Sequence, residues 1–234
     1  MLILGDRLPT EFKPYNPSHL YLQTPLYKGE TLEEIDGQWV RTKKWEKKVL
    51  DGGLGYVFGS SQTGFKVISL SGFVKGKGLP ITIKYDGKIL NPWAPGNPIP
   101  DQCWFTGGFD GIYLTIPNTD SGWGENYTPT ADEIKAYFNG WVMYKDSTNG
   151  ALYDGTGTKV WAKRYCGVGT PAATWVTGTV AVYLSGVPTC PITMNDMGYT
   201  PYQLHYQLAT PTTEVVPHEG ELVLHEGANQ IEVF

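Results

Sequence analysis

The stretch Ile81–Leu90, "ITIKYDGKIL", contains the two local signals that decide the fold class. Its first five residues alternate apolar and polar side chains, which is the two-residue period of a β-strand. The alternation ends at Asp86-Gly87, a pair that supplies the positive φ values of a tight turn. We therefore expect a strand followed at once by a reversal of the chain.

The same pattern recurs along the chain, with turn residues separating short strand-like segments at intervals of about ten residues. The segment "EEIDGQWVRTKKWEKKVL" predicts a hairpin that turns at Asp36-Gly37. This succession is typical of a sandwich or barrel rather than an α/β fold, so we predict an all-β, jelly-roll-like antiparallel β-sandwich. The other expected strands are Phe65–Val74, Ile81–Leu90, Gly111–Pro117, Trp141–Lys145, Lys159–Cys166, Trp175–Leu184, Leu204–Ala209, Glu221–Glu226 and Gln230–Phe234.

Composition supports a turn-rich chain, because 29 of its 234 residues are glycine and 17 are proline. Prolines punctuate residues 1–30, and a central strand does not tolerate them. We expect residues 1–30 to form an extended N-terminal arm or connector and residues 31–234 to form the sandwich.

Charge and cysteine content exclude several classes. A net charge of -5 argues against nucleic-acid binding, which needs a basic field. The three cysteines show no C-x-x-C spacing, so we expect free thiols. The start "MLILGDRLPT" resembles neither a signal peptide nor a membrane span, and no membrane insertion is expected. A function outside the cell would then need another route of exit, or the chain is a fragment of a longer protein.

The stretch Pro129–Trp141, "PTADEIKAYFNGW", predicts one short helix over about residues 130–139. Thr130 is a good N-cap and Glu133 completes a capping box, while Asn139-Gly140 supplies the stop. Capping already explains the acidic residues, so we expect a structural plug on the sandwich rather than a catalytic element. The apolar stripe that would face the sheet is Ile134, Tyr137, Phe138 and Trp141.

Two long predicted loops, Asn91–Gly111 and Pro117–Thr130, carry tryptophan among Asn, Asp and Gly. Sugars are bound by an exposed aromatic platform beside side chains that form directional hydrogen bonds. The alternative use of a loop tryptophan is as a lid over the core. The candidate ligand-binding residues are Trp93, Trp104, Asp110, Asn118, Asp120, Trp123 and Tyr127.

A basic segment, "VRTKKWEKKV", places charges on both faces of a predicted strand. Lysines of this kind usually protect an edge strand from unwanted pairing, and the functional alternative is contact with teichoic acid phosphate.

Metal and catalytic chemistry have weaker signals. "NTDSG" lacks further acidic ligands at calcium-loop spacing, so no metal and no cofactor are expected. No nucleophile-elbow or metalloprotease motif occurs, and we expect no enzyme. The rival is a polysaccharide depolymerase that uses two carboxylates among Asp110, Asp120 and Glu125.

Three segments carry a resemblance to a known family: "PTADEIKAYFNGWVMY", "HYQLATPTTEVV" (His205–Val216) and "TPLYKGETLEEIDGQWVRTKKWEKKVLDGG" (Thr24–Gly53). They resemble, in the same order, segments of minor structural and tail-fibre proteins from phages and prophages of Gram-positive bacteria. The matching motifs are structural and not catalytic. Residues 54–127 lie outside the resemblance, and we expect specificity to reside there.

The resemblance implies a distal tail component that contacts the host surface. It implies a cell-wall carbohydrate or teichoic acid as receptor, other tail subunits as partners, and a homotrimer. It also implies that the protein is made in the host cytoplasm, assembles into the virion tail and is released by lysis. A purely structural tail module without receptor contact remains the second alternative to a binding domain.

Overall fold

The computed structural model describes residues 19–22, 25–51, 53–93, 97–145, 151–163, 184–185, 200–221 and 230–232. Strands dominate these residues, and helices are short, so the predicted all-β class is confirmed. The elements, in order, are β1 (His19–Leu22), β2 (Thr31–Ile35), β3 (Gln38–Leu50), β4 (Gly55–Gln62), β5 (Phe65–Ser71), β6 (Gly76–Ile83), β7 (Asn91–Pro92), β8 (Gln102–Phe105), β9 (Gly111–Pro117), α1 (Asn118–Ser121), α2 (Ala131–Phe138), β10 (Trp141–Tyr144), β11 (Val160–Lys163), β12 (Leu184–Ser185), β13 (Tyr202–Val215), β14 (His218–Glu221) and β15 (Gln230–Glu232).

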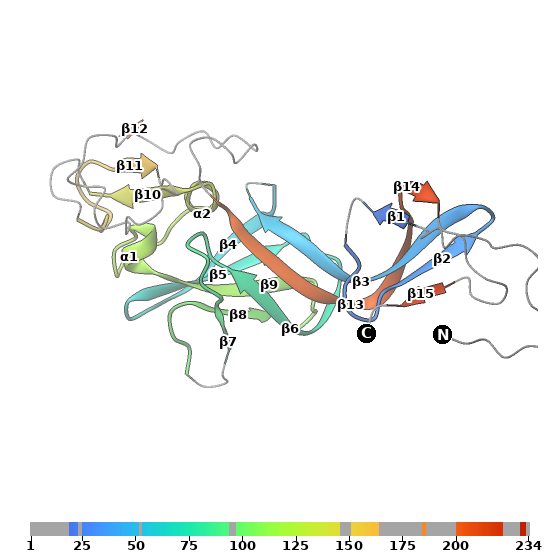
Figure 1. Cartoon of the computed structure of the whole chain (residues 1–234). Coiled ribbons are helices and arrows are strands. Elements are labelled where there is room, and N and C mark those ends of the chain that lie inside the picture. Colours follow the sequence, from blue (N-terminus) through green and yellow to red (C-terminus); the bar gives the residue numbers. More distant parts are fainter. Residues whose placement is uncertain are drawn as a thin grey trace, which may run out of the picture. The chain divides into compact units, whose positions relative to one another are not determined.

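Two five-stranded sheets make up most of the structure (Figure 1). One has the order β4-β5-β9-β8-β7 and the other the order β15-β2-β3-β13-β6. A single hydrophobic cluster receives side chains from both, for example Ile68 and Leu114 from the first sheet and Leu204 from the second. This shared core makes the architecture a β-sandwich, as predicted. Two smaller sheets, β1-β14 and β10-β11-β12, complete the described strands.

The chain divides into two compact units. One combines Met1–Lys43 with Thr212–Phe234, and the other is Lys44–Pro211. We call them the terminal unit and the central unit. This division differs from the predicted boundary at residue 30, because the N-terminal segment pairs with the C-terminal one: β1 is antiparallel to β14, and β2 to β15.

The predicted hairpin is confirmed in the terminal unit. β2 and β3 pair in register, and the turn residues Asp36 and Gly37 have φ values of 51° and 75°. The idea that the basic segment is an edge strand is wrong, because β3 lies between β2 and β13. Its Arg41 is buried and forms ion pairs with Glu30 and Glu214, so it is not a surface charge.

Strand β6 confirms the predicted alternation and the turn at Asp86-Gly87, where Ile83 bridges to Ile89. Between Ile81 and Tyr85, however, the polar side chains of Thr82 and Lys84 are the buried ones. Thr82 is buried and its hydroxyl donates to the Cys103 sulfur at 2.9 Å, whereas Ile81 is exposed. Alternation therefore identified the strand but not which face enters the core. Cys103 is a free thiol, as predicted, and Cys166 and Cys190 lie outside the described residues.

Helix α2 has the predicted cap and stop. The Thr130 hydroxyl accepts from the Glu133 amide at 3.3 Å, the Glu133 carboxylate accepts from the Thr130 amide at 2.9 Å, and Gly140 has φ 88°. All four residues of the predicted stripe are buried. The ring of Phe138 lies 5.0 Å from that of Tyr56 on β4, so α2 packs on the sheet as the expected plug (Figure 1).

The two predicted loops contain regular structure. Asn91–Gly111 includes β7 and β8, and Pro117–Thr130 begins with α1. The segment after α1 is tightly packed: a Cβ at Gly122, where φ is 81°, would lie 1.6 Å from the Met143 carbonyl oxygen. Glycine is required there. Strand β9 matches its prediction, β4 was not predicted, and most of the expected strand Trp175–Leu184 lies outside the described residues.

Among the described residues, the helices are too short or too polar to cross a membrane.

Candidate functional site

The candidate site lies on the outward face of the β4-β5-β9-β8-β7 sheet. Strand β9 buries Ile112 and Leu114 completely and turns the half-buried Tyr113 outward. Trp104 of β8 is the cross-strand partner of Tyr113, so both side chains share this face. The register of the sheet, and not a flexible loop, places these two rings side by side.

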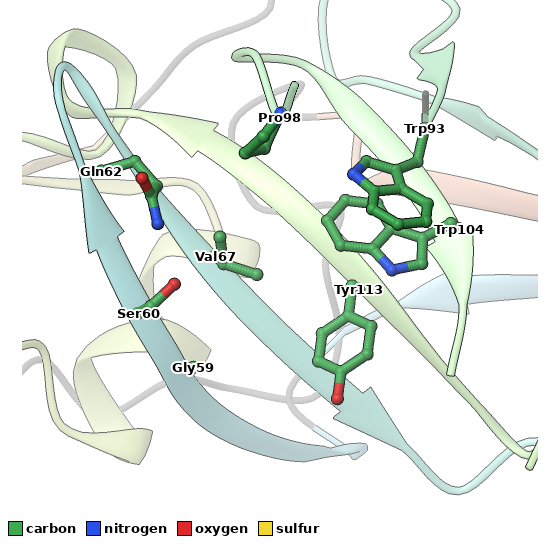
Figure 2. Close-up of a pocket in the computed structure, with 8 residues that line it drawn as sticks. All are labelled: Gly59, Ser60, Gln62, Val67, Trp93, Pro98, Trp104 and Tyr113. Atoms are coloured by element: carbon green, nitrogen blue, oxygen red, sulfur yellow. The ribbon is translucent and has the colours of Figure 1, made fainter. Parts of the chain in front are cut away.

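Three rings form a continuous series, which we call the aromatic row: Trp93, Trp104 and Tyr113. Trp93 follows β7 and stacks on Trp104, with ring centroids 5.2 Å apart and planes inclined by 22°. The centroids of Trp104 and Tyr113 are 5.3 Å apart. All three rings are half-buried, and Figure 2 shows them grouped on one side of a hollow. The row offers an apolar, weakly solvated wall.

An open groove of about 440 Å³ runs beside the aromatic row. Figure 2 shows Ser60 and Gln62 of β4 on the side opposite the rings, with Val67 of β5 between. A β-bulge between Phe58 and Ser60 displaces β4 at this point. The complete lining is Gly59, Ser60, Gln62, Val67, Trp93, Pro98, Trp104 and Tyr113.

Hydrogen bonds fix the segment that brings Pro98 to the groove. The Thr115 hydroxyl donates to the Ile99 carbonyl at 2.7 Å, and it accepts from the Gln102 amide at 2.7 Å. The Gln102 side chain in turn accepts from the Ile99 amide at 2.9 Å. Thr115 therefore ties the segment between β7 and β8 to β9, the strand that carries Tyr113.

An ion network around the buried Lys84 supports the same segment. Lys84 pairs with Asp120 and, at 3.1 Å, with Asp101, while Lys88 pairs with Asp101 at 2.5 Å. Burial of the Lys84 ammonium would lower its pKa, but the carboxylates of Asp120 and Asp101 and the nearby Tyr85 outweigh burial and raise the pKa above its usual value. Lys84 therefore stays charged and connects the end of β6 with α1 and with the residue before β8.

The predicted site residues separate into two groups. Trp93 and Trp104 come together in the groove. Asp110 is exposed in the turn before β9 and accepts from the Thr106 hydroxyl at 3.4 Å, away from the groove lining. Asp120 is committed to Lys84, and buried Asn118 donates to the Glu125 carboxylate at 2.9 Å.

Trp123 is not an exposed platform. Its side chain is 0% exposed, and its ring lies 5.5 Å from that of Tyr137 in the hydrophobic core. The prediction that Trp123 binds ligand as an exposed platform is therefore wrong. Trp123 packs in the core beneath the surface, which was the alternative role for a loop tryptophan. The chain turns sharply at Gly122 immediately before it, which directs the indole inward.

Tyr127 belongs to the surroundings of helix α2. Its hydroxyl lies 2.7 Å from the Glu133 carboxylate and accepts from the Lys159 ammonium at 3.0 Å. Burial is the main cause that raises the pKa of Tyr127 to about 12, so the phenol keeps its proton and donates to Glu133. It supports the capping box and does not line the groove.

Sequence reasoning missed Tyr113 in the aromatic row and the residues on the opposite side of the groove. Tyr113 was detectable, because strict alternation in the predicted strand Gly111–Pro117 leaves it on the face opposite Ile112 and Leu114. Ser60 and Gln62 had no comparable signal, because β4 carries glycine and serine that are typical of a turn.

The described lining of the groove is uncharged and contains no carboxylate. Within the described part of the chain, no group of three or more His, Cys, Asp or Glu side chains is placed to hold a metal ion. The arrangement suits stacking and neutral hydrogen bonding. Comparison of the chain with protein-family models, with curated proteins and with solved structures finds no match.

Proposed function

We propose that this chain is a non-catalytic receptor-binding domain that recognises a carbohydrate-containing polymer of a bacterial cell wall through the groove beside Trp93, Trp104 and Tyr113. The observation that carries the proposal is the aromatic row. Three large rings remain half-exposed on the outside of a sheet whose other face is a complete core. Contiguous exposed apolar surface of this kind marks interaction sites.

The groove matches the surface chemistry of a sugar. A pyranose ring has apolar C–H faces, which pack on aromatic rings, and a rim of hydroxyl groups, which need hydrogen-bonding partners. The aromatic rings supply the apolar surface for the C–H faces. The amide of Gln62 and the hydroxyls of Ser60 and Tyr113 line the groove and can form hydrogen bonds with the sugar hydroxyls. The volume of about 440 Å³ lies in the usual range of ligand sites.

The depolymerase alternative has less support. A glycosidase needs two carboxyl groups about 5 to 9.5 Å apart at the scissile bond. Of the three carboxylates considered from the sequence, Asp120 pairs with Lys84, and Glu125 accepts from Asn118 and the Gly64 amide. Asp110 is exposed and lies outside the groove lining. The uncharged lining of the groove favours binding without cleavage.

The biological setting remains part of the proposal and rests on the sequence resemblance. A tail or tail-fibre protein that carries this domain would be made in the host cytoplasm and would assemble with other tail subunits, as a homotrimer, into the virion. Adhesion to the host wall would then be the task of the groove.

The test is retention of the purified protein on insoluble cell walls of a Gram-positive host, with Trp104→Ala and Trp93→Ala as variants. Removal of a stacking ring loses roughly 1–2 kcal/mol of contact and burial, so each variant should bind about 5- to 30-fold more weakly. Phe109→Ala is the matched control, because Phe109 is an exposed aromatic side chain outside the groove lining. Thermal melting of each variant would show that the fold is retained.

Three outcomes separate the alternatives. Loss of retention in the two tryptophan variants, with the control unchanged, supports the proposal. Release of reducing ends from the walls would replace it with the depolymerase. Absence of any retention by the wild-type protein would leave the structural tail module.

A further inference from the structure

The charge of the groove points to one class of cell-wall polymer. We infer that the ligand is an uncharged glycan and not the phosphate-bearing backbone of a teichoic acid; this inference rests on the proposed function. The eight described residues that line the groove include no Asp, Glu, Lys, Arg or His. A site for repeated phosphates is normally built from Arg and Lys, because charge-assisted hydrogen bonds supply its affinity.

The nearest candidate cation in the sequence is unavailable to the groove. Lys66 precedes Val67 on β5, and strand alternation sends its side chain to the opposite face of the sheet. Its ammonium is buried, donating to the Ser61 hydroxyl at 2.9 Å and to the Glu125 carbonyl at 2.6 Å. Burial lowers the pKa of Lys66 despite the nearby Glu125 carboxylate, which further weakens it as a phosphate ligand.

Two further lysines, Lys84 and Lys88, also have carboxylate partners. Lys84 and Lys88 are held by Asp101 and Asp120 in the network that supports the segment between β7 and β8. The chain as a whole carries a net charge of -5, so its long-range field repels a polyanion. Neither local nor overall charge therefore favours teichoic acid phosphate.

The polar groups that do line the groove suit a neutral sugar. The Gln62 amide presents both a donor and an acceptor, and hydroxyl groups such as that of Ser60 do the same. A sugar hydroxyl is itself donor and acceptor, so it pairs with either group. A phosphate oxygen only accepts, and it would leave the Gln62 carbonyl oxygen without a partner from the ligand.

The experiment measures binding of the intact chain to two separate probes: phosphate-free wall polysaccharide and purified wall teichoic acid. The decisive variants are Gln62→Lys and Gln62→Glu, which replace the same exposed side chain by opposite charges. For a neutral ligand both lose the amide and should weaken binding to the polysaccharide by similar factors, within about twofold of each other. Raising the salt concentration from about 50 to 200 mM should leave the wild-type affinity unchanged.

The opposite result overturns the inference. If teichoic acid is the polymer bound, Gln62→Lys strengthens binding, Gln62→Glu weakens it, and the wild-type affinity falls as salt rises.

Trp104→Ala distinguishes the two levels of the proposal. If that variant loses teichoic acid binding, the groove is a receptor site and only the ligand class is wrong. If neither polymer is bound, or if binding is indifferent to Trp104, the proposed function fails and the inference fails with it.

Discussion

At the scale of single residues, tryptophan has two roles in this chain: packing in the core and forming part of the surface. Trp123 has a fully buried side chain in the central core. Trp93 and Trp104 keep part of their rings at the surface and stack on each other. The local sequence around all three is similar, with glycine, proline or acidic neighbours. Their difference arises from the sheet beneath them, so substitution should affect stability at one site and binding at the other.

Trp123→Ala should destabilise the fold severely. Removing a buried indole forfeits its burial and leaves a cavity, which costs about 3–5 kcal/mol in the free energy of unfolding. Trp93→Ala, its matched control, removes one stacking contact and should cost only about 1 kcal/mol. Urea unfolding followed by circular dichroism measures both. Equal losses at the two positions would contradict the burial difference on which the site assignment depends.

At the scale of elements, helix α2 is the best specified part of the chain. Its cap, stop and apolar stripe all follow from contiguous residues, and a helix of this length needs the sheet beneath it to persist. The cap also contacts a residue outside the helix, because the Glu133 carboxylate accepts from the Lys159 ammonium as well as from the Thr130 amide. Loss of the cap should therefore be measurable in the whole domain.

Thr130→Ala should lower the free energy of unfolding by about 1 kcal/mol, because the Glu133 amide loses its side-chain acceptor. Thr130→Ser retains the hydroxyl and should restore most of the loss. Thr128→Ala, a nearby exposed position outside the helix, should have no effect beyond about 0.5 kcal/mol. Chemical unfolding of the three variants provides the comparison. An unchanged Thr130→Ala protein would show that packing alone holds the helix.

The same elements show which parts of the fold can be predicted from the sequence. The β2–β3 turn, helix α2 and strand β9 were predictable because their signals are local: an Asp-Gly pair, a capping box and strict alternation. Strand β4 was not, because its glycines and serines favour turns and its strand conformation comes from pairing with β5. Between Ile81 and Tyr85 the alternation was correct, but Thr82 and Lys84 are the buried side chains, since they have polar partners inside.

The candidate site was predictable to a similar degree. Aromatic residues among turn residues indicated Trp93 and Trp104, but the same rule selected Trp123, which is buried. Side chains brought together across strands, such as Gln62 and Tyr113, share a groove only because of the register of β4, β5 and β9. Register depends on long-range pairing, which a local pattern does not contain.

At the scale of the whole molecule, we expect the titration of buried groups to limit stability at high pH. Burial raises the pKa of the Cys103 thiol to about 12, and burial, with the Glu46 carboxylate, raises the pKa of Tyr206 to about 12. Tyr127 behaves in the same way. The folded protein keeps these protons at a pH where the unfolded chain releases them, so unfolding releases protons and becomes more favourable as pH rises.

Two lysines act in the same direction, and one opposes them. The pKa values of Lys84 and Lys159 are raised because nearby acidic and tyrosine side chains outweigh burial, so their stabilising contribution is full below the unfolded pKa and disappears through the folded one. The lowered pKa of Lys66 has the opposite effect, since deprotonation relieves the burial of its charge. Within the described part of the chain, five groups with raised pKa values therefore favour a loss of stability in alkali, and Lys66 resists it.

We expect the melting temperature to stay level from neutrality to about pH 9 and then to fall steadily toward pH 12, the interval between the ordinary thiol pKa of 9.0 and the raised value of about 12. Thermal scans at a series of pH values, with tyrosinate absorbance recorded in parallel, measure the transition. Cys103→Ala lacks the thiol that titrates earliest, so its melting temperature should fall less over this interval than that of the wild type, although it starts lower because a buried side chain is smaller. A melting temperature that stays level to pH 12 would show that these groups have the same pKa values in the folded and unfolded states, contrary to the effect of burial.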